Sequence, residues 1–163
     1  MYVARQYTDA IQLGERALEL HPDFVQGLLT LGLAHSRLGH HGRAIALFER
    51  IVSLSGRAPM SLGLLGFGLA VAGKTSDARA SLDELRTRSA HEYVSLTTQC
   101  MILFGLGQRD DFFADALTVA DQGSVNGFGL EATFGPYLDD LAGEPRFTEL
   151  FRRFHLVPRT TQP

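Results

Sequence analysis

The chain has 163 residues, of which 45% are apolar, 18 are acidic and 15 are basic, so its formal net charge is −3. This length suffices for one domain with a buried core or for about four short repeats. The slight negative charge argues against the basic surface that nucleic-acid binding requires, and the single cysteine, Cys100, excludes an internal disulfide. No apolar run reaches the roughly 20 residues that span a bilayer, and residues 1–20 contain no signal peptide, so we expect a cytoplasmic protein without membrane contact.

Apolar residues at helical spacing, bounded by Gly and Pro, predict five helices in the first part of the chain. Asp23 is the expected N-cap of the second helix, and Gly39 is expected to terminate it. Thr75 or Ser76 is expected to cap the fifth. The predicted ranges are Gln6–Leu20, Asp23–Leu38, His41–Leu54, Ala58–Ala72 and Thr75–Arg88.

Two more helices, Glu92–Leu106 and Asp110–Ala120, complete the regular part of the chain. Residues 123–135 are rich in Gly, Ser and Asn and predict a loop or a short irregular helix, after which Tyr137–Leu141 can form one helical turn. Glu144-Pro145 then starts a final helix, because proline suits the first helical position. No segment alternates long enough to predict a strand. The apolar stripe of the final helix consists of Phe147, Leu150, Phe151 and Phe154.

Two segments of the chain match each other at an offset of 34 residues. Seven apolar or small positions of the first segment recur as similar residues in the second. This period is typical of helix–turn–helix repeats, which stack into a solenoid that binds partners and rarely does chemistry. The matched positions are Leu28/Leu62, Leu31/Leu65, Gly32/Gly66, Gly39/Gly73, Ala44/Ala78, Phe48/Leu82 and Ile51/Leu85.

This spacing resembles the tetratricopeptide repeat (TPR) over about residues 1–120. In that family the first helix of each pair carries Leu-Gly, and the second carries a small residue, an aromatic residue and another small residue. The resemblance implies an all-α, right-handed superhelix of antiparallel helix pairs with a C-terminal capping helix. Gly32 and Ala44 would let two paired helices approach closely, and Phe48 would fill the space between neighbouring repeats.

The resemblance also implies a division of the chain. A TPR array would cover residues 1–122, a C-terminal loop and capping helix 123–158, and a tail 159–163. Gly14 takes the place of the aromatic residue in the first repeat, and Cys100 and Phe112 replace the glycine and the small alanine of the last. The array would consist of a half repeat at 1–22, repeats at about 25–56 and 59–90, and a degenerate repeat at 93–120.

A narrower resemblance concerns the C-terminal part of the chain. The segments Gly105–Asp110, Pro136–Leu138, Glu144–Phe147 and Leu150–Leu156 are similar to the closing segment of certain bacterial multidomain regulators. These proteins join a TPR region to an adenylate-cyclase domain, a winged-helix DNA-binding domain or a protein kinase domain. The resemblance implies the regulatory C-terminal part of a bacterial signalling protein.

In TPR arrays the first helix of each pair lines a concave groove, and transferring this geometry predicts the groove of this chain. The predicted lining is apolar with one arginine, unlike the basic grooves that clamp a peptide carboxylate. The expected partner is therefore a protein or peptide with an apolar stripe, and large side chains such as Phe67, Met101 and Phe104 are the expected hot spots. The predicted lining residues are Leu29, Leu33, Ser36, Arg37, Phe67, Ala70, Val71, Met101 and Phe104.

Something must cover this groove, because the helix Ala58–Ala72 carries no charge on any face and such helices are normally buried. The first candidate is the chain's own C-terminal helix, since solenoids need polar-faced caps. The second is another copy of the chain, which would form a homodimer. The third is a partner's amphipathic helix or an apolar ligand. The alternative function is thus a sensor domain that binds an apolar small molecule in the same groove.

No catalytic residue, metal site or cofactor is predicted. His35, His40 and His41 cluster near a turn, but no HExxH or CxxC pattern accompanies them, so solvated histidines are the favoured interpretation. Cys100 occupies a packing position of the repeat. The glycines of residues 63–68 lie inside a helical pattern without a preceding strand, which argues against a nucleotide loop. We therefore expect a non-catalytic module.

Overall fold

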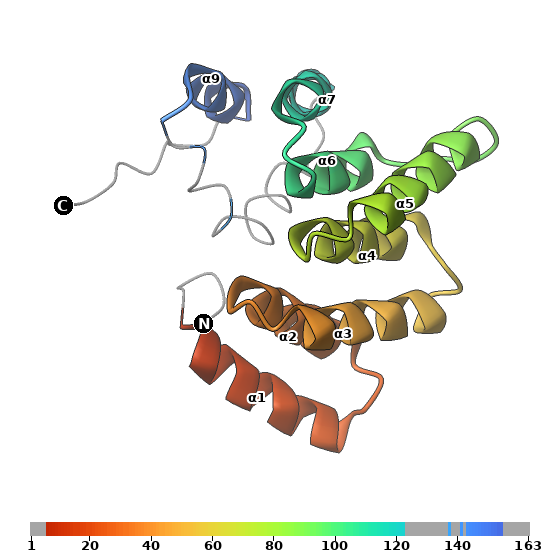
Figure 1. The fold of residues 1–163 in the computed structure, drawn as a ribbon, viewed down its shortest axis with the longest axis vertical. Coiled ribbons are helices and arrows are strands. Elements are labelled where there is room, and N and C mark those ends of the chain that lie inside the picture. The colour runs from red at the N-terminus through yellow and green to blue at the C-terminus, as the bar shows by residue number, and fades with distance from the viewer. Residues whose placement is uncertain (1–5, 123–136, 138–140, 142, 155–163) are drawn as a thin grey trace.

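The structure is a computed structural model that describes residues 6–122, 137, 141 and 143–154. Within these residues it contains eight helices and no strand, so the predicted all-α class is confirmed. Successive helices pack against each other in chain order as a stack, with α1 at one end and α9 beside α7 at the other (Figure 1). The helices are α1 (Tyr7–Leu20), α2 (Val25–Arg37), α3 (His41–Leu54), α4 (Pro59–Val71), α5 (Thr75–Arg88), α6 (Leu96–Gly105), α7 (Arg109–Asp121) and α9 (Pro145–Arg153).

The 34-residue period of the sequence recurs in the helix boundaries. The odd-numbered helices α1, α3, α5 and α7 begin at residues 7, 41, 75 and 109, and the even-numbered helices α2, α4 and α6 end at residues 37, 71 and 105. The even-numbered helices are followed by Gly39, Gly73 and Gly107, which have φ angles of 77°, 76° and 70°. Only glycine adopts this left-handed conformation without a steric cost, so these residues end three helices in the same way.

The side chain of Phe48 joins two successive helix pairs. Its ring, on α3, is 0% exposed. A Cβ atom added at Gly32 of α2 would lie 2.5 Å from Phe48 Cε1, and one added at Gly68 of α4 would lie 2.6 Å from Phe48 Cδ2. The ring therefore occupies space that two absent side chains leave free. The prediction that Phe48 fills the gap between neighbouring pairs is confirmed.

Glycines also bring α4 and α6 into close contact. A Cβ atom at Gly63 would lie 2.3 Å from Thr98 Cγ2 and 3.0 Å from the Thr98 carbonyl oxygen. One turn later, a Cβ atom at Gly66 would lie 2.5 Å from Ile102 Cδ1. These helices approach so closely that the backbone of one contacts the other, which explains why α4 tolerates several glycines despite their low helix propensity.

Three details of the predicted helix starts are wrong, and the first two concern N-caps. Asp23 does not cap α2: the helix begins at Val25 after Phe24, and the Asp23 carboxylate accepts a hydrogen bond from Arg50 at 2.8 Å instead. Neither Thr75 nor Ser76 caps α5, which begins at Thr75 without a side-chain cap.

The sixth helix begins at Leu96 rather than at Glu92. The backbone N–H of Glu92 donates to the Arg88 carbonyl at 3.0 Å, and the Glu92 carboxylate pairs with the Arg88 guanidinium. These bonds attach Glu92 to the end of α5, so α6 starts four residues later. The predicted loop at 123–135 and the predicted tail at 159–163 lie outside the described residues.

Two ion pairs occupy equivalent positions in successive helix pairs, with their charges exchanged. Arg50 on α3 binds Asp23 at 2.8 Å, and Glu84 on α5 binds Arg57 at 2.7 Å. Residue 57 lies 34 positions after residue 23, and residue 84 lies 34 after residue 50. The first pair connects α3 to the segment before α2, and the second connects α5 to the segment before α4. The helix carries the positive charge in the first pair and the negative charge in the second.

The last helix, α9, lies beside α7 and runs in the same direction. Arg146 near the start of α9 binds Asp110 near the start of α7 at 2.7 Å, and Arg153 binds Asp121 at 2.6 Å at the other ends. The Arg146 guanidinium also lies 4.5 Å from the centre of the Phe113 ring. The predicted apolar stripe is confirmed, because three of its residues are buried and the fourth is half-buried: Phe147, Leu150, Phe151 and Phe154.

Candidate interaction face

The predicted groove residues all lie on α2, α4 and α6, and these helices contact one another in that order. Their exposure divides them into two classes. Residues in the same register position, Leu33, Phe67 and Met101, are fully buried and belong to the core. Ser36 and Ala70 are buried as well. The half-buried residues form what we call the groove face: Leu29, Arg37, Val71 and Phe104.

Two of the expected hot spots, Phe67 and Met101, are therefore not available to a partner in this conformation. The third, Phe104, packs against the second helix of its own pair. Its ring centre lies 5.4 Å from that of Phe112 on α7, and the Arg109 guanidinium lies 5.0 Å from the Phe104 ring centre. The accessible part of the groove face is thus centred on α2 and α4.

A tyrosine from the C-terminal part of the chain contacts this face. The Tyr137 ring meets Phe67 edge to face, with ring centres 5.0 Å apart and an interplanar angle of 89°. The Arg37 guanidinium lies over the same ring, 4.8 Å from its centre. Only 4% of Tyr137 is exposed. An aromatic side chain distant in sequence is therefore held between α2 and α4.

The sequence indicated the apolar stripe of the last helix as the first of three candidates for this covering role and did not point to Tyr137. The stripe packs against α7 instead, whereas Tyr137 reaches the face that the sequence identified. The available signal was the 34-residue register, since Tyr137 lies 34 positions after the fully buried Leu103. Register alone, however, cannot say which residue a buried side chain contacts.

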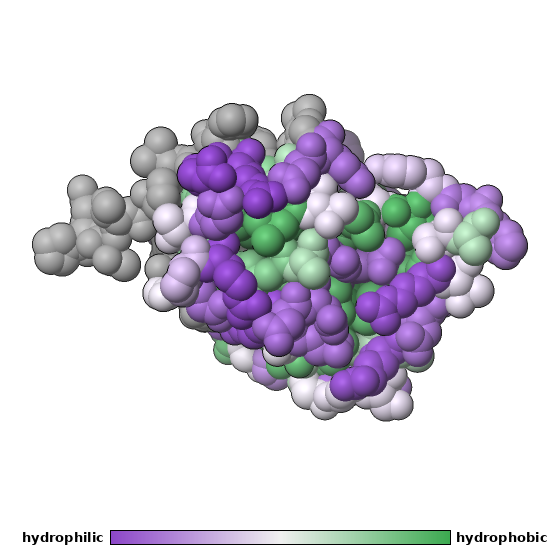
Figure 2. All heavy atoms as spheres, turned by 90° about the horizontal axis from the view of Figure 1, so that it is seen from above, coloured by the Kyte–Doolittle hydropathy of each residue, from purple (hydrophilic) through white to green (hydrophobic). Residues whose placement is uncertain are grey.

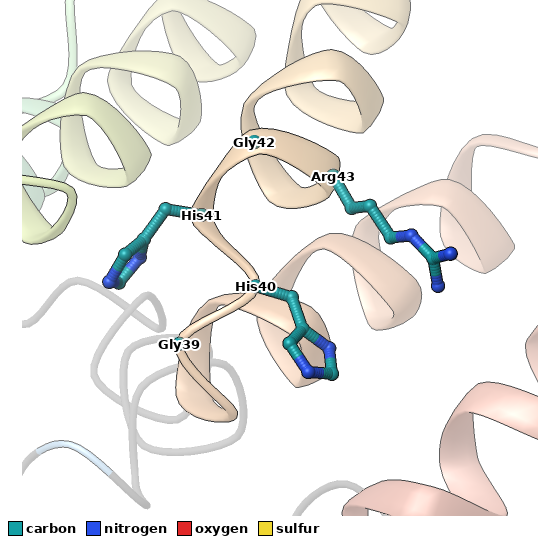
Figure 3. Close-up of a pocket in the computed structure, with 5 residues that line it drawn as sticks. All are labelled: Gly39, His40, His41, Gly42 and Arg43. Carbon is teal, nitrogen blue, oxygen red and sulfur yellow. The ribbon is translucent and has the colours of Figure 1, made fainter.

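The histidine cluster lies at the turn between α2 and α3, beside an open hollow of about 550 Å³ lined by residues 39–43. The side chains of His40, His41 and Arg43 point in different directions from this turn (Figure 3). The Nδ1 atoms of His35 and His40 lie 3.2 Å apart in a hydrogen bond. Among the described residues, no group of three or more His, Cys, Asp or Glu side chains is placed to hold a metal ion. These side chains do not converge on a common point, which a reacting group would require.

His35 is the buried member of the histidine pair, with 4% of its surface exposed. Burial lowers its pKa, and the nearby charges of His40 and Arg43 lower it further, whereas Glu15 of α1 acts in the opposite direction. A histidine whose pKa is lower in the folded state stays neutral there to a lower pH than in the unfolded chain. The unfolded chain then binds more protons below its ordinary pKa of about 6.5, so stability decreases as the pH falls through this range.

We predict that His35→Asn, which keeps a polar group but cannot titrate, reduces the loss of stability between pH 7.5 and pH 5. The measurement is the midpoint of urea unfolding at several pH values. His91→Asn provides the control, because His91 is an exposed residue in the turn after α5. An unchanged pH profile in the His35 variant would show that His35 does not contribute to the acid sensitivity.

The pKa values of two further groups are shifted, those of the buried Cys100 and the half-buried Asp115. Burial raises the pKa of the Cys100 thiol, and the nearby Asp115 raises it further. Burial likewise raises the pKa of Asp115. A thiol held in its neutral form is a poor nucleophile, so Cys100 has the character of a packing residue.

The face formed by α2, α4 and α6 is therefore an apolar surface with one guanidinium group, and an aromatic side chain is bound to it. Its chemistry is suited to holding apolar and aromatic groups.

No helix in the described part of the chain is long and apolar enough to cross a membrane. Comparison of the chain with protein-family models, curated proteins and solved structures finds no match in any of the three.

Proposed function

We propose that the chain is a non-catalytic protein–protein interaction module of the TPR type, and that it is the regulatory C-terminal part of a cytoplasmic bacterial signalling protein. Its binding surface is the groove face on α2, α4 and α6, and its partner is a protein or peptide with an apolar stripe. The observation that carries the proposal is the contact of Tyr137 with Phe67 and Arg37, since this face already binds a side chain from a distant part of the chain.

Several features of the fold support the TPR assignment. The helices recur with a period of 34 residues, and a glycine with positive φ follows each of the even-numbered helices. The Phe48 ring lies against Gly32 of its own helix pair and Gly68 of the next, in keeping with the position that the repeat pattern gives to this aromatic residue. These features are typical of a superhelix of helix pairs, which binds ligands along its inner face.

The arrangement of α9 supports its role as a cap. Its apolar stripe is turned toward the stack, and its charged residues pair with one another and with α7, as in the bonds of Arg153 to Glu149 and Asp121. Seen from this end, hydrophilic side chains cover much of the surface and apolar ones lie between them (Figure 2). A solenoid needs such a polar end to stay soluble.

The proposal predicts that peptides with an apolar stripe bind to the groove face. We would select 12-residue peptides against the immobilised chain from a phage library and measure their affinity by fluorescence anisotropy. Val71→Asp places a charge at a half-buried groove position, and we expect it to weaken binding about tenfold or more, as for interface hot spots. Phe67 is unsuitable for this test, because a charge at a fully buried position would disrupt the core.

Leu13→Asp provides the matched control for Val71→Asp. Leu13 is also an apolar helix residue, but it is 51% exposed and lies on α1, which does not belong to the groove face. Circular dichroism would verify that both variants stay helical, and light scattering would detect a second copy as the occupant. Equal loss of binding in both variants, or the absence of any selected peptide, would contradict the proposal.

A further inference from the structure

Phe67 and Arg37 belong to different helices but contact one aromatic ring, that of Tyr137. We infer that they form a subsite that recognises an aromatic side chain of the partner peptide, and that Tyr137 occupies this subsite in the free chain. The inference rests on the proposed function, which it makes specific: the partner presents a tyrosine or phenylalanine ring at the junction of α2 and α4. The bound Tyr137 shows which chemistry fits.

The Tyr137 ring makes two contacts that depend on its aromatic charge distribution, an edge-to-face contact with Phe67 and a cation–π contact with Arg37. Its interplanar angle of 89° to Phe67 is that of an edge-to-face pair, in which the positive edge of one ring meets the negative face of the other. The Arg37 guanidinium lies 4.8 Å from the ring centre, within the range of a cation–π contact. A saturated side chain of the same size would bury similar apolar surface but would make neither contact.

The 34-residue register shows that this subsite is particular to one junction. The residues at the positions of Arg37 and Phe67 in the next junction, between α4 and α6, are Val71 and Met101. These two positions of the second junction therefore hold neither a cation nor an aromatic ring. Of the two junctions between even-numbered helices in the described part of the chain, only the first can recognise an aromatic group in this way.

The position of Phe67 depends on a glycine in the neighbouring helix. A Cβ atom at Gly105 of α6 would lie 3.3 Å from Phe67 Cδ2 and 2.9 Å from the Ala70 Cβ. Any larger residue at position 105 would push against the Phe67 ring and its helix. Gly105 stands at the register position that holds Arg37 in α2 and Val71 in α4. The residue of α6 at this position therefore has no side chain, and the space it leaves is occupied by the Phe67 ring.

Removing the internal occupant tests the subsite directly. In the Tyr137→Ala variant we would titrate p-cresol, which is the tyrosine side chain, and 4-methylcyclohexanol, which has a similar size but no π system. Binding would be followed by the chemical shifts of the Phe67 ring and the Arg37 side chain. We expect saturable binding of p-cresol to this variant, at least about fivefold tighter than that of the saturated alcohol, and no binding to the parent chain.

Two further variants separate aromatic recognition from the filling of an apolar void. Adding Arg37→Gln or Phe67→Leu to Tyr137→Ala should each reduce the preference for p-cresol, because each removes one of the two aromatic contacts. If Tyr137→Ala does not fold, the test becomes the free energy of unfolding of Tyr137→Phe and Tyr137→Leu. The inference requires the phenylalanine variant to be the more stable of the two.

The outcomes separate this inference from the proposed function. Equal affinity for the two alcohols, or equal stability of the phenylalanine and leucine variants, would overturn the aromatic subsite. Selected peptides that still lose affinity in Val71→Asp would leave the interaction module in place. Enrichment of tyrosine or phenylalanine among peptides selected on the Tyr137→Ala variant, and its loss with Arg37→Gln, would support both.

Discussion

Replacing Phe48 by alanine is expected to lower the free energy of unfolding by about 3–5 kcal/mol, the usual cost of truncating a fully buried phenylalanine. The ring lies between Gly32 and Gly68, and neither residue has a side chain that could move into the space it leaves. The cavity would therefore persist. Since a small domain is stable by only about 5–15 kcal/mol, this single change removes a large part of the total.

The loss at Phe48 should also change the shape of the unfolding curve. In a repeat array each unit contacts only its neighbours, and cooperativity depends on the interfaces between units. Urea unfolding of Phe48→Ala, followed by circular dichroism, should show a broader or two-step transition. Tyr93→Ala is the control, because the Tyr93 ring is 85% exposed. A single sharp transition with a loss below about 1 kcal/mol would contradict the role of Phe48 as the link between helix pairs.

Replacing Gly63 by alanine is expected to destabilise the chain by about 1–3 kcal/mol, although alanine is the better helix former by about 1 kcal/mol. The new methyl group would lie 2.3 Å from Thr98 Cγ2 and 3.0 Å from the Thr98 carbonyl oxygen. The threonine side chain can rotate away, but the carbonyl cannot. Helices α4 and α6 must then move apart, and the close packing around them is lost.

Gly42→Ala is the matched control for this substitution. Gly42 lies in the first turn of α3, and nothing comes within 4 Å of a Cβ atom added there. We expect this variant to gain up to about 1 kcal/mol from helix propensity alone. The measurement is the change in the midpoint temperature of thermal unfolding for each glycine substitution. Opposite signs would establish that contact with α6, rather than helix propensity, determines the effect of alanine at position 63. A stabilising effect at both positions would refute this explanation.

The parts of the fold that depend on local chemistry could be predicted from the sequence. Gly39 and Gly73 identified turns because glycine alone accepts a positive φ without cost, and Pro145 marked the start of α9. Asp23 was wrongly predicted to cap α2, because its carboxylate binds Arg50 instead, 27 residues later in the sequence, and local pattern does not reveal such a contact. The predicted start of α6 at Glu92 was wrong because Glu92 is bonded to Arg88 at the end of α5.

The candidate face could be predicted only in part, because it depends on long-range contacts. Repeat spacing placed Arg37, Phe67 and Val71 on helices that do contact one another. It did not show that Phe67 is fully buried, nor that Tyr137, 70 residues later in the chain, contacts it. The occupant of a surface depends on where the chain returns after the helix pairs end. The 34-residue register extends to Tyr137, but it does not specify which residue that side chain contacts.

The exchanged charges of the Asp23–Arg50 and Arg57–Glu84 pairs make the first two helix pairs distinguishable during folding. Several of their buried positions, such as Leu28 and Leu62, hold the same kind of residue at the 34-residue spacing, so one pair could be aligned with the other in a misassembled chain. Deleting residues 24–57 would preserve the spacing of the buried residues, but it would bring Asp23 opposite Glu84. In such a shortened chain the two carboxylates would repel each other. The exchanged polarity of the ion pairs thus makes the correct order of helix pairs more stable than an array assembled out of order.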